Sequence, residues 1–247
     1  MTSRAHSRRR GSYGLDAPGV LLALSAGGAL LLAAAHKARE HALGLVAVLL
    51  ALAALGLLAT SASYLYTSRR GKLRAWTRVL AGLGLVGDER VLDLGCGRGA
   101  VLVLAARLLP RGRATGLDLW SRSDQSGNGE AAARRNAIRE GVEDRVELRT
   151  GDMRSLPFAD GAYDLVLSSL AIHNIPRPSE RAAAIDEAVR VLRPGGRLAI
   201  ADILHTAEYA RQLQGRGLSE VRERSLGPGC WFGPWMATRL VTARKAS

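Results

Sequence analysis

The stretch VLDLGCGRGA combines an aspartate with closely spaced glycines directly after an apolar run. Glycine lets the backbone approach a ligand without a Cβ in the way, and a helix that begins at such a loop offers unpaired N–H groups. Two nucleotide-type sites fit the spacing. Gly95, Gly97 and Ala100 match the G-x-G-x-x-G/A pattern of dinucleotide-binding units. With Asp93 and Gly99 included, the same loop reads D-x-G-x-G-x-G, which is typical of sites for S-adenosylmethionine.

Acidic residues also close the next two strand-like segments. Asp118 ends RATGLD, nineteen residues after Gly99, where a carboxylate can accept both hydroxyl groups of a ribose. Nicotinamide enzymes share that spacing, so Asp118 indicates a ribose without selecting the cofactor. Asp152 follows RVELRTG, and helix capping or turn formation is the structural alternative for both acids. Because acids end three successive strands on the side where α/β sheets bind ligands, we favour a binding site.

One histidine is placed to act as a base. His173 lies in SSLAIHNIPRP, just past the fourth strand-like segment, and an imidazole can accept a proton near neutral pH. A phenol or an activated carbon needs such a base, whereas an amine or a thiolate does not. Packing or hydrogen bonding within this loop explains His173 equally well. His205, after the fifth strand-like segment, is the weaker candidate.

Alternating strand and helix patterns must position these residues. Apolar runs such as RVLDLG and YDLVLSSLA alternate with helical segments such as GEAAARRNAIREG and SERAAAIDEAVRVL. We expect the last of these helices to stop at Pro194-Gly195-Gly196, with RLAIADI as the next strand. Parallel pairing through right-handed crossovers follows from that order. The fold class predicted for this part is therefore α/β, with a doubly wound and mostly parallel sheet.

Four segments occur in the order and spacing of one family: VLDLGCGRG, GLDLW, GDMRSLPFADGAYDLVLSS and VLRPGGRLAIADI. They resemble the class I, Rossmann-like S-adenosylmethionine-dependent methyltransferases, especially the type 11 members, over about residues 91–203. A dehydrogenase can supply the first two segments but has no reason to supply the last two in this register. The resemblance implies a seven-stranded sheet and S-adenosyl-L-methionine as the cofactor.

The resemblance also implies a role for several residues. Asp93 helps to anchor the methionine end of the cofactor, and Asp118 receives the ribose hydroxyls. Asp152 receives the adenine amino group, while the backbone N–H of Met153 reaches a ring nitrogen. The cofactor-binding residues expected on this basis are Asp93, Gly95, Cys96, Gly97, Gly99, Asp118, Leu119, Asp152, Met153 and Ser168.

Two uncharged apolar segments precede the predicted domain. Residues 17–35 and 42–63 are each long enough for a helix that crosses the roughly 30 Å hydrocarbon core of a bilayer. We predict a transmembrane hairpin at 17–68, between a basic tail at 1–16 and a methyltransferase domain at 72–247. A cleaved signal peptide or a buried helical pair is less favoured, because a second span follows the first at once.

The positive charge is concentrated around these apolar segments. Up to residue 80 there are eleven Lys and Arg against two acids, whereas the rest of the chain has 24 against 20. The excess therefore indicates membrane topology, and no nucleic-acid partner is expected. By the positive-inside rule both termini and the predicted domain face the cytoplasm, on the cell membrane. Two cysteines are too few for a disulfide framework or a thiolate metal cluster, so no metal site is expected.

Two further segments are distinctive without a clear role. The polar loop WSRSDQSGNGE is longer than the shortest family pattern, and Asp124 or Asn128 could contact the cofactor. Turn chemistry is the preferred explanation for both residues. Near the end of the chain, PGCWFGPWM places Trp231, Phe232 and Trp235 close together. These aromatic residues could line an acceptor site, but we favour packing of a turn.

These features predict a membrane-anchored S-adenosylmethionine-dependent methyltransferase with His173 as the catalytic candidate. The segment SSLAIHNI resembles a motif of the family's quinone C-methyltransferases and lipid methyltransferases. Together with the predicted hairpin, this resemblance implies a small-molecule acceptor that is lipidic or quinone-like. The hairpin could equally tether an enzyme that acts on a soluble metabolite or on a partner protein. Two alternatives remain open from the sequence. One is a nicotinamide-dependent oxidoreductase, and the other is a non-catalytic S-adenosylmethionine-binding module.

Overall fold

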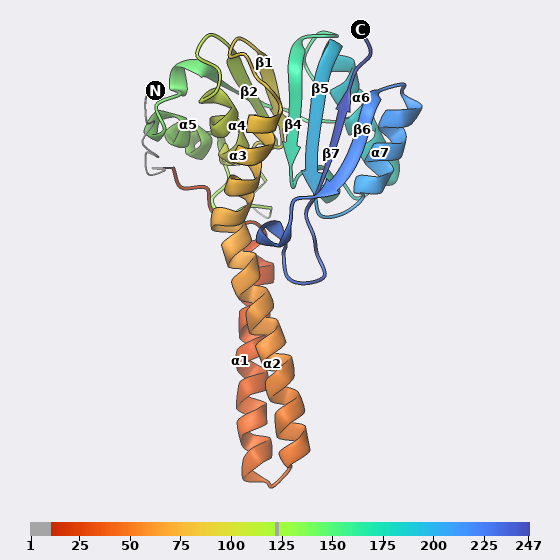
Figure 1. Ribbon diagram of the computed structural model, residues 1–247. Helices are drawn as coiled ribbons and strands as arrows, with labels where there is room; N and C mark the ends of the chain where they lie inside the picture. Colours follow the sequence, from red (N-terminus) through yellow and green to blue (C-terminus); the bar gives the residue numbers. More distant parts are fainter. Residues whose placement is uncertain (1–10, 122–123) are drawn as a thin grey trace, which may run out of the picture.

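A helical hairpin projects from an α/β domain in the computed structural model, which describes residues 11–121 and 124–247 (Figure 1). The hairpin consists of α1 (Pro18–Glu40) and α2 (Gly44–Tyr66), and both are long and apolar enough to cross a membrane by length and composition. Most of the predicted basic tail lies outside the described residues.

Small side chains let the two hairpin helices pack closely. The Leu58 side chain fills the space beside Gly28, and Ser25 and Ser61 share a hydrogen bond of 2.7 Å. The helix α1 extends beyond the predicted span 17–35, because it continues through most of the polar stretch HKAREH, residues 36–41, to Glu40. Lysine, alanine, arginine and glutamate are strong helix formers, so a polar stretch of this composition extends the helix.

A seven-stranded sheet forms the centre of the domain, in the order β3-β2-β1-β4-β5-β7-β6. The first five strands in that order pair in parallel, and β7 runs antiparallel to β5 and β6. The predicted doubly wound, mostly parallel sheet is thus confirmed. The strands are β1 (Arg90–Leu94), β2 (Arg113–Asp118), β3 (Val146–Thr150), β4 (Tyr163–Ser169), β5 (Leu192–Asp202), β6 (Ser219–Ser225) and β7 (Arg239–Arg244).

Helices cover both faces of the sheet. Buried residues of α3, α4 and α5 pack on one face, and buried residues of α6 and α7 pack on the other. These helices are α3 (Lys72–Gly82), α4 (Ala100–Ala106), α5 (Glu130–Arg139), α6 (Pro178–Val191) and α7 (Thr206–Gly215). The expected stop of α6 is close to its end at Val191, but β5 already begins at Leu192. Pro194 cannot extend a helix and biases the residue before it toward extended backbone, so the proline and its two glycines belong to the strand.

The second hairpin helix continues into the domain without a break. It passes from α2 through a π-helical turn, η1 (Thr67–Gly71), into α3, which gives one helix of 39 residues. Trp76 of α3 is buried, and its indole Nε1 donates a hydrogen bond of 2.8 Å to the Ser169 hydroxyl at the end of β4. The hairpin is therefore fixed to the sheet by a packed helix and not by a loop.

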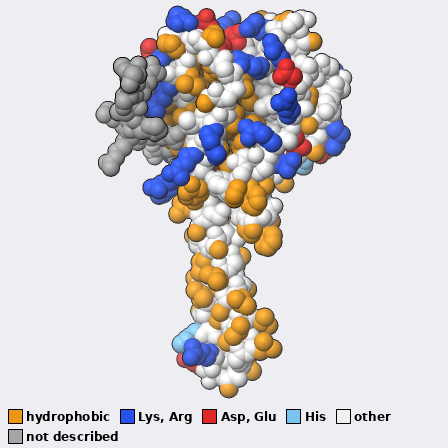
Figure 2. Space-filling view, in the orientation of Figure 1, with side chains coloured by type: hydrophobic (Ala, Val, Ile, Leu, Met, Phe, Trp, Pro, Cys, Tyr) orange, Lys and Arg blue, Asp and Glu red, His pale blue; other side chains and the backbone are white. Residues whose placement is uncertain are grey.

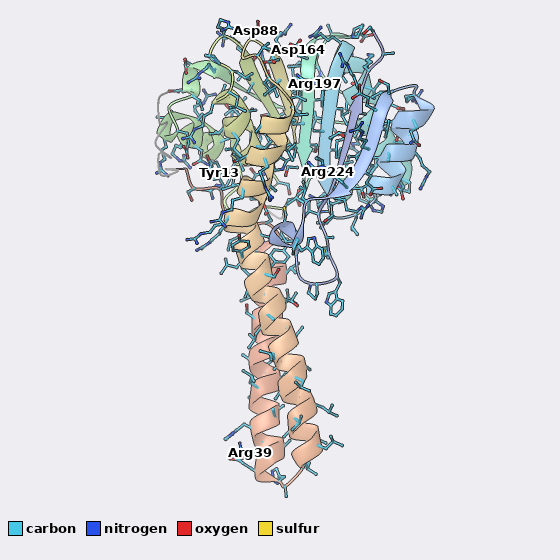
Figure 3. The ribbon with its side chains drawn as sticks, viewed as in Figure 1. Tyr13, Arg39, Asp88, Asp164, Arg197 and Arg224 are labelled. Atoms are coloured by element: carbon cyan, nitrogen blue, oxygen red, sulfur yellow. The ribbon has the colours of Figure 1, made fainter. Side chains whose placement is uncertain are left out.

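The carboxyl ends of the parallel strands face the hairpin. In Figure 1 the arrowhead of β4 points toward α1 and α2. Figure 3 shows Asp88, Asp164 and Arg197 near the opposite edge of the sheet, and Arg39 at the far end of the hairpin. Open α/β sheets bind their ligands outside the carboxyl ends of the strands. The edge at which a ligand is expected thus lies beside the apolar helices.

Candidate functional site

A cavity of about 370 Å³ lies between the carboxyl ends of the strands and the base of the hairpin. Small-molecule sites span about 300–1,000 Å³, so this cavity has the size of a small-molecule site. Residues of the hairpin junction line it together with residues of the sheet. Eight of the ten predicted cofactor residues are in its wall: Asp93, Gly95, Cys96, Gly97, Asp118, Leu119, Asp152 and Met153.

The other two predicted cofactor residues lie outside the cavity wall. Gly99 is the N-cap of α4, with a φ of +79°. Ser168 is buried and its hydroxyl donates a hydrogen bond of 3.0 Å to the Leu94 carbonyl. Side chains alternate along a strand, and the next residue, Ser169, lines the cavity instead.

The glycine loop requires glycine at two positions. Gly95 has a φ of +68°, and a Cβ there would overlap the Ala171 side chain. Gly97 has a φ of +53°, and a Cβ there would lie 2.6 Å from the Gln125 side-chain oxygen. Burial raises the pKa of the neighbouring Cys96 thiol well above its usual range, so this thiol is neutral at physiological pH and no nucleophile. The loop therefore offers backbone and space to a ligand.

Asp93 is a buried carboxyl group without a partner. Its side chain is in the cavity wall and 1% exposed, and neither carboxyl oxygen has a hydrogen bond within the described structure. Burial raises its pKa to about 8. The backbone N–H of Leu102, which lies near the carboxyl group without regular hydrogen-bond geometry, and the ammonium of Lys72 offset part of that shift. Buried polar groups normally have partners. An orphan carboxyl group at this place fits a ligand that brings a cation or a donor, such as the methionine end of S-adenosylmethionine.

Asp118 ends β2 inside a set of donors. Its carboxylate accepts hydrogen bonds from the backbone N–H of Gly97 (2.7 Å) and of Trp120 (2.5 Å), and from the Asn128 amide (3.3 Å). Burial nevertheless raises the pKa of Asp118. These bonds fix the carboxylate at the cavity wall, where a ribose hydroxyl can reach it. Asn128, for which turn chemistry was the preferred explanation, thus also orients this carboxylate.

Asp152 carries a partner of its own. The Arg154 guanidinium donates hydrogen bonds of 2.6 to 3.0 Å to its carboxylate, which lowers the pKa of Asp152. Arg154 also forms an ion pair of 2.9 Å with Glu180 of α6. The Asp152 carboxylate is therefore engaged by Arg154, and the Met153 side chain beside it reaches the space next to Gly95.

His173 lines the cavity and forms a pair with Asp202. His173 belongs to the short turn η3 (Ile172–Asn174), and its Nδ1 lies 2.5 Å from Oδ1 of Asp202, although the two are not aligned as a regular hydrogen bond. The His173 backbone N–H donates to Oδ2 at 3.1 Å, and the Tyr209 hydroxyl donates to the same oxygen at 3.4 Å. Asp202 ends β5 and is fully buried. With Nδ1 against the carboxylate, Nε2 is the nitrogen left for the cavity.

Sequence reasoning missed the contribution of the chain before α1. The Lys72 ammonium lies 2.6 Å from the Asp16 carboxylate, and both residues line the cavity with their side chains mostly buried. Gln125 joins this cluster, because its Nε2 donates to Asp16 (3.3 Å) and its oxygen accepts from the Arg98 backbone N–H (2.9 Å). Backbone hydrogen bonds between residues 15–17 and 124–126 hold the segment in place. The polar loop thus anchors the N-terminal segment over the site, a contact for which no local pattern gives a signal.

Comparisons with known proteins identify the class of domain. A family model described as a methyltransferase domain matches residues 92–200. The chain is 36% identical over 127 residues to an arsenite methyltransferase of Halobacterium salinarum, covering 51% of this chain and 30% of that protein. It is 36% identical over 130 residues to a demethylmenaquinone methyltransferase of Lactiplantibacillus plantarum, covering 52% and 51%. The chain thus spans about a third to a half of the length of these relatives.

The fold agrees with that class. A geranyl diphosphate methyltransferase in complex with S-adenosylmethionine superposes with a TM-score of 0.58 at 18% identity, covering 72% of this chain and 87% of that one. Residues 92–200 therefore match a methyltransferase domain, and S-adenosylmethionine is the cofactor of the class whose fold the chain shares. The ambiguity of the glycine loop is resolved in favour of D-x-G-x-G-x-G, and the nicotinamide alternative is set aside.

Proposed function

We propose that this protein is a methyltransferase anchored in the cell membrane by its hairpin, and that it methylates a membrane-dissolved acceptor with a quinol-type head. One observation carries the proposal. The cavity at the carboxyl ends of the strands is lined at the same time by the cofactor loop and by Tyr64 of α2, Lys72 of α3 and Ala17 before α1. A site built partly from the base of an apolar hairpin is within reach of a molecule dissolved in the bilayer.

The surface supports insertion of the hairpin. Figure 2 shows apolar side chains along the hairpin and Lys and Arg side chains around its junction with the domain. Five basic residues follow the second span within eleven positions: Arg69, Arg70, Lys72, Arg74 and Arg78. Only Lys37 and Arg39 lie near the hairpin turn. The positive-inside rule then favours the domain, together with both termini, on the cytoplasmic side.

The residues of the site have separate tasks. Bound S-adenosylmethionine supplies a methyl group on a positively charged sulfur. Asp93 and Asp118 hold the two ends of its polar part, and the Gly95–Gly97 backbone leaves room for it. Nε2 of His173 would accept the proton that a phenolic hydroxyl or an activated ring carbon loses as it takes the methyl group. The bond between the methyl carbon and sulfur would break, and S-adenosylhomocysteine would leave. Asp202 fixes the imidazole, and proton transfer to a positioned side chain contributes about 10²–10⁴-fold to rate.

Methylation is tested on the full chain in phospholipid vesicles with methyl-tritiated S-adenosylmethionine. The acceptors are a reduced 1,4-naphthoquinol with a four-isoprene tail, its tail-less analogue, and phosphatidylethanolamine as an amine acceptor. We expect tritium in an organic-soluble product of the naphthoquinol, and its loss in His173→Gln with cofactor binding retained. Label in phosphatidylethanolamine alone contradicts the quinol-type head. Normal cofactor binding without any labelled product favours the non-catalytic binding module.

The orientation in the membrane has its own test. Cys96 and Cys230 are buried, so a cysteine added at the surface can be labelled selectively. We expect Ala42→Cys, next to the hairpin turn, to react with a membrane-impermeant maleimide in intact cells. Ser247→Cys should react only after lysis. The reverse pattern, or labelling of both positions in intact cells, contradicts the proposed topology.

A further inference from the structure

A second hollow lies on the side of the hairpin. It has a volume of about 580 Å³, and its walls are the α2 face from Ala53 to Ser63 and the loop from Pro228 to Trp235. No charged residue lines it. This hollow is called the tail groove below. Apart from Leu57, the α2 residues in its wall have small or short side chains, such as Ala53, Gly56 and Thr60.

The loop that forms the other wall is fastened to the helix. The Trp231 carbonyl accepts a hydrogen bond of 2.6 Å from the Thr67 hydroxyl and one of 3.1 Å from the Ser63 hydroxyl. At η1, the Gly229 carbonyl lies directly against Gly71, where no side chain would fit. The groove is therefore a built feature with two fixed walls. Trp235 at its rim is 88% exposed, which suits an indole at a membrane interface better than one in water.

One wall is common to the groove and the methyl-transfer cavity. Tyr64 and Phe232 both line the cavity, and their rings meet edge to face with centroids 4.6 Å apart. Their chain neighbours Ser63, Trp231 and Gly233 line the groove. The ring pair thus stands between a polar cavity that contains carboxylates and an apolar hollow that contains none.

We propose that the tail groove binds the single aliphatic tail of the acceptor. The Tyr64–Phe232 ring pair then lies between the tail in the groove and the reacting head in the cavity. This inference rests on the proposed function. The cavity has room for a cofactor and a compact head at most, and its carboxylates exclude an alkyl chain. The groove adjoins it and is apolar. One turn of a partner helix fills on the order of 500 Å³. A groove of about 580 Å³ therefore holds little more than one turn, which is too short for a docked helix. A single alkyl chain, one methylene wide, suits it better.

The acceptor class follows from this division. It is an amphiphile with a compact, ionisable head and one linear or isoprenoid chain that leaves the head from one side. A phospholipid with two acyl chains does not fit a groove of this size, and a head without a tail leaves the groove empty. Tail binding contributes to affinity and positions the head, so its loss should appear in KM more than in kcat.

A glycine substitution tests the groove without disturbing the cavity. Gly56 lines the groove and has open space for a Cβ, so Gly56→Leu places an isobutyl group in the groove. Gly44 in the same helix is equally open but lies at the far end of the hairpin, which makes Gly44→Leu the matched control. Both variants add the same leucine side chain to an open position of α2, so a difference between their KM values for the tailed acceptor reports the groove.

We expect Gly56→Leu to raise KM about tenfold for the naphthoquinol with a four-isoprene tail, because the new side chain displaces about two methylene groups. KM for the tail-less analogue should not change, and Gly44→Leu should change neither value. Equal effects on both acceptors, or no effect of Gly56→Leu on the tailed one, overturn the inference.

Photolabelling separates this inference from the proposed reaction. A naphthoquinol whose sixteen-carbon tail carries a terminal diazirine is illuminated with the protein in vesicles, with no methyl donor. We expect crosslinks within residues 53–63 and 231–235, and fewer of them in Gly56→Leu. If no acceptor is methylated but these crosslinks form, the proposed reaction fails and the groove stands. Crosslinks spread evenly over the hairpin overturn the groove.

Discussion

The orphan carboxyl group of Asp93 makes cofactor binding depend on pH in a specific way. With a pKa of about 8 it carries roughly 0.9 of a proton at pH 7 in the free protein. The ammonium of S-adenosylhomocysteine, seated against it, stabilises the ionised form and expels that proton. Between pH 6 and pH 7, where the ligand stays charged, the affinity should therefore rise about ninefold.

Isothermal titration measures both quantities. Binding of S-adenosylhomocysteine at pH 7 in buffers of different ionisation enthalpy should show roughly 0.9 proton released per ligand. Methylthioadenosine, which has the nucleoside but lacks the amino-acid end, should release none. Asp93→Asn should bind S-adenosylhomocysteine with little pH dependence. Release of less than about 0.2 proton by the unmodified chain, or unchanged release in Asp93→Asn, refutes the reasoning.

Four other predictions follow from the same geometry. Because a raised acid pKa costs stability above the unfolded pKa, the free energy of unfolding should fall by up to about 1.4 kcal/mol per pH unit between about pH 4 and pH 8, and chemical denaturation of Asp93→Asn should lack this term. Asp202→Asn should lower kcat about 10²-fold or more, while His173→Gln keeps cofactor affinity in a binding assay. Gly97→Ala should weaken cofactor binding and cost about 1–2 kcal/mol of stability in thermal unfolding; an unchanged Tm argues against a constrained loop. Asp16→Ala leaves Lys72 buried without its partner and should cost about 3 kcal/mol in detergent; a cost below 1 kcal/mol contradicts a structural ion pair.

The sequence predicts those parts of the site whose residues lie close together along the chain. Asp93 and its glycines share one loop, and Asp118 follows at the end of the next strand, so a local pattern places them at one edge of the sheet. The family resemblance implies seven strands, whereas their order is seen in the structure. The expectation for Ser168 did not account for side-chain alternation, which turns its neighbour Ser169 to the cavity.

The parts that the sequence does not predict are contacts between distant segments. Asp16 and Lys72 are 56 positions apart, and nothing in either neighbourhood indicates that they pair. The role of Gln125 depends on a backbone bridge to residue 16. Likewise, the pairing of Tyr64 with Phe232 becomes visible only once the loop after β6 is placed on α2. Such contacts are set by tertiary packing and carry no periodicity of their own.

The unbroken helix from Gly44 to Gly82 is about 58 Å long and has the geometry of a lever. A hydrophobic helix adapts to a thinner or thicker bilayer by tilting. In the membrane arrangement proposed above, a tilt of the half within the bilayer would be passed on to Trp76 and through it to the end of β4, because η1 joins α2 to α3 without a hinge loop. Bilayer thickness would then set the angle between the cavity and the lipid surface. Because this angle affects access of a membrane-dissolved acceptor, turnover would differ between membranes of different lipid composition.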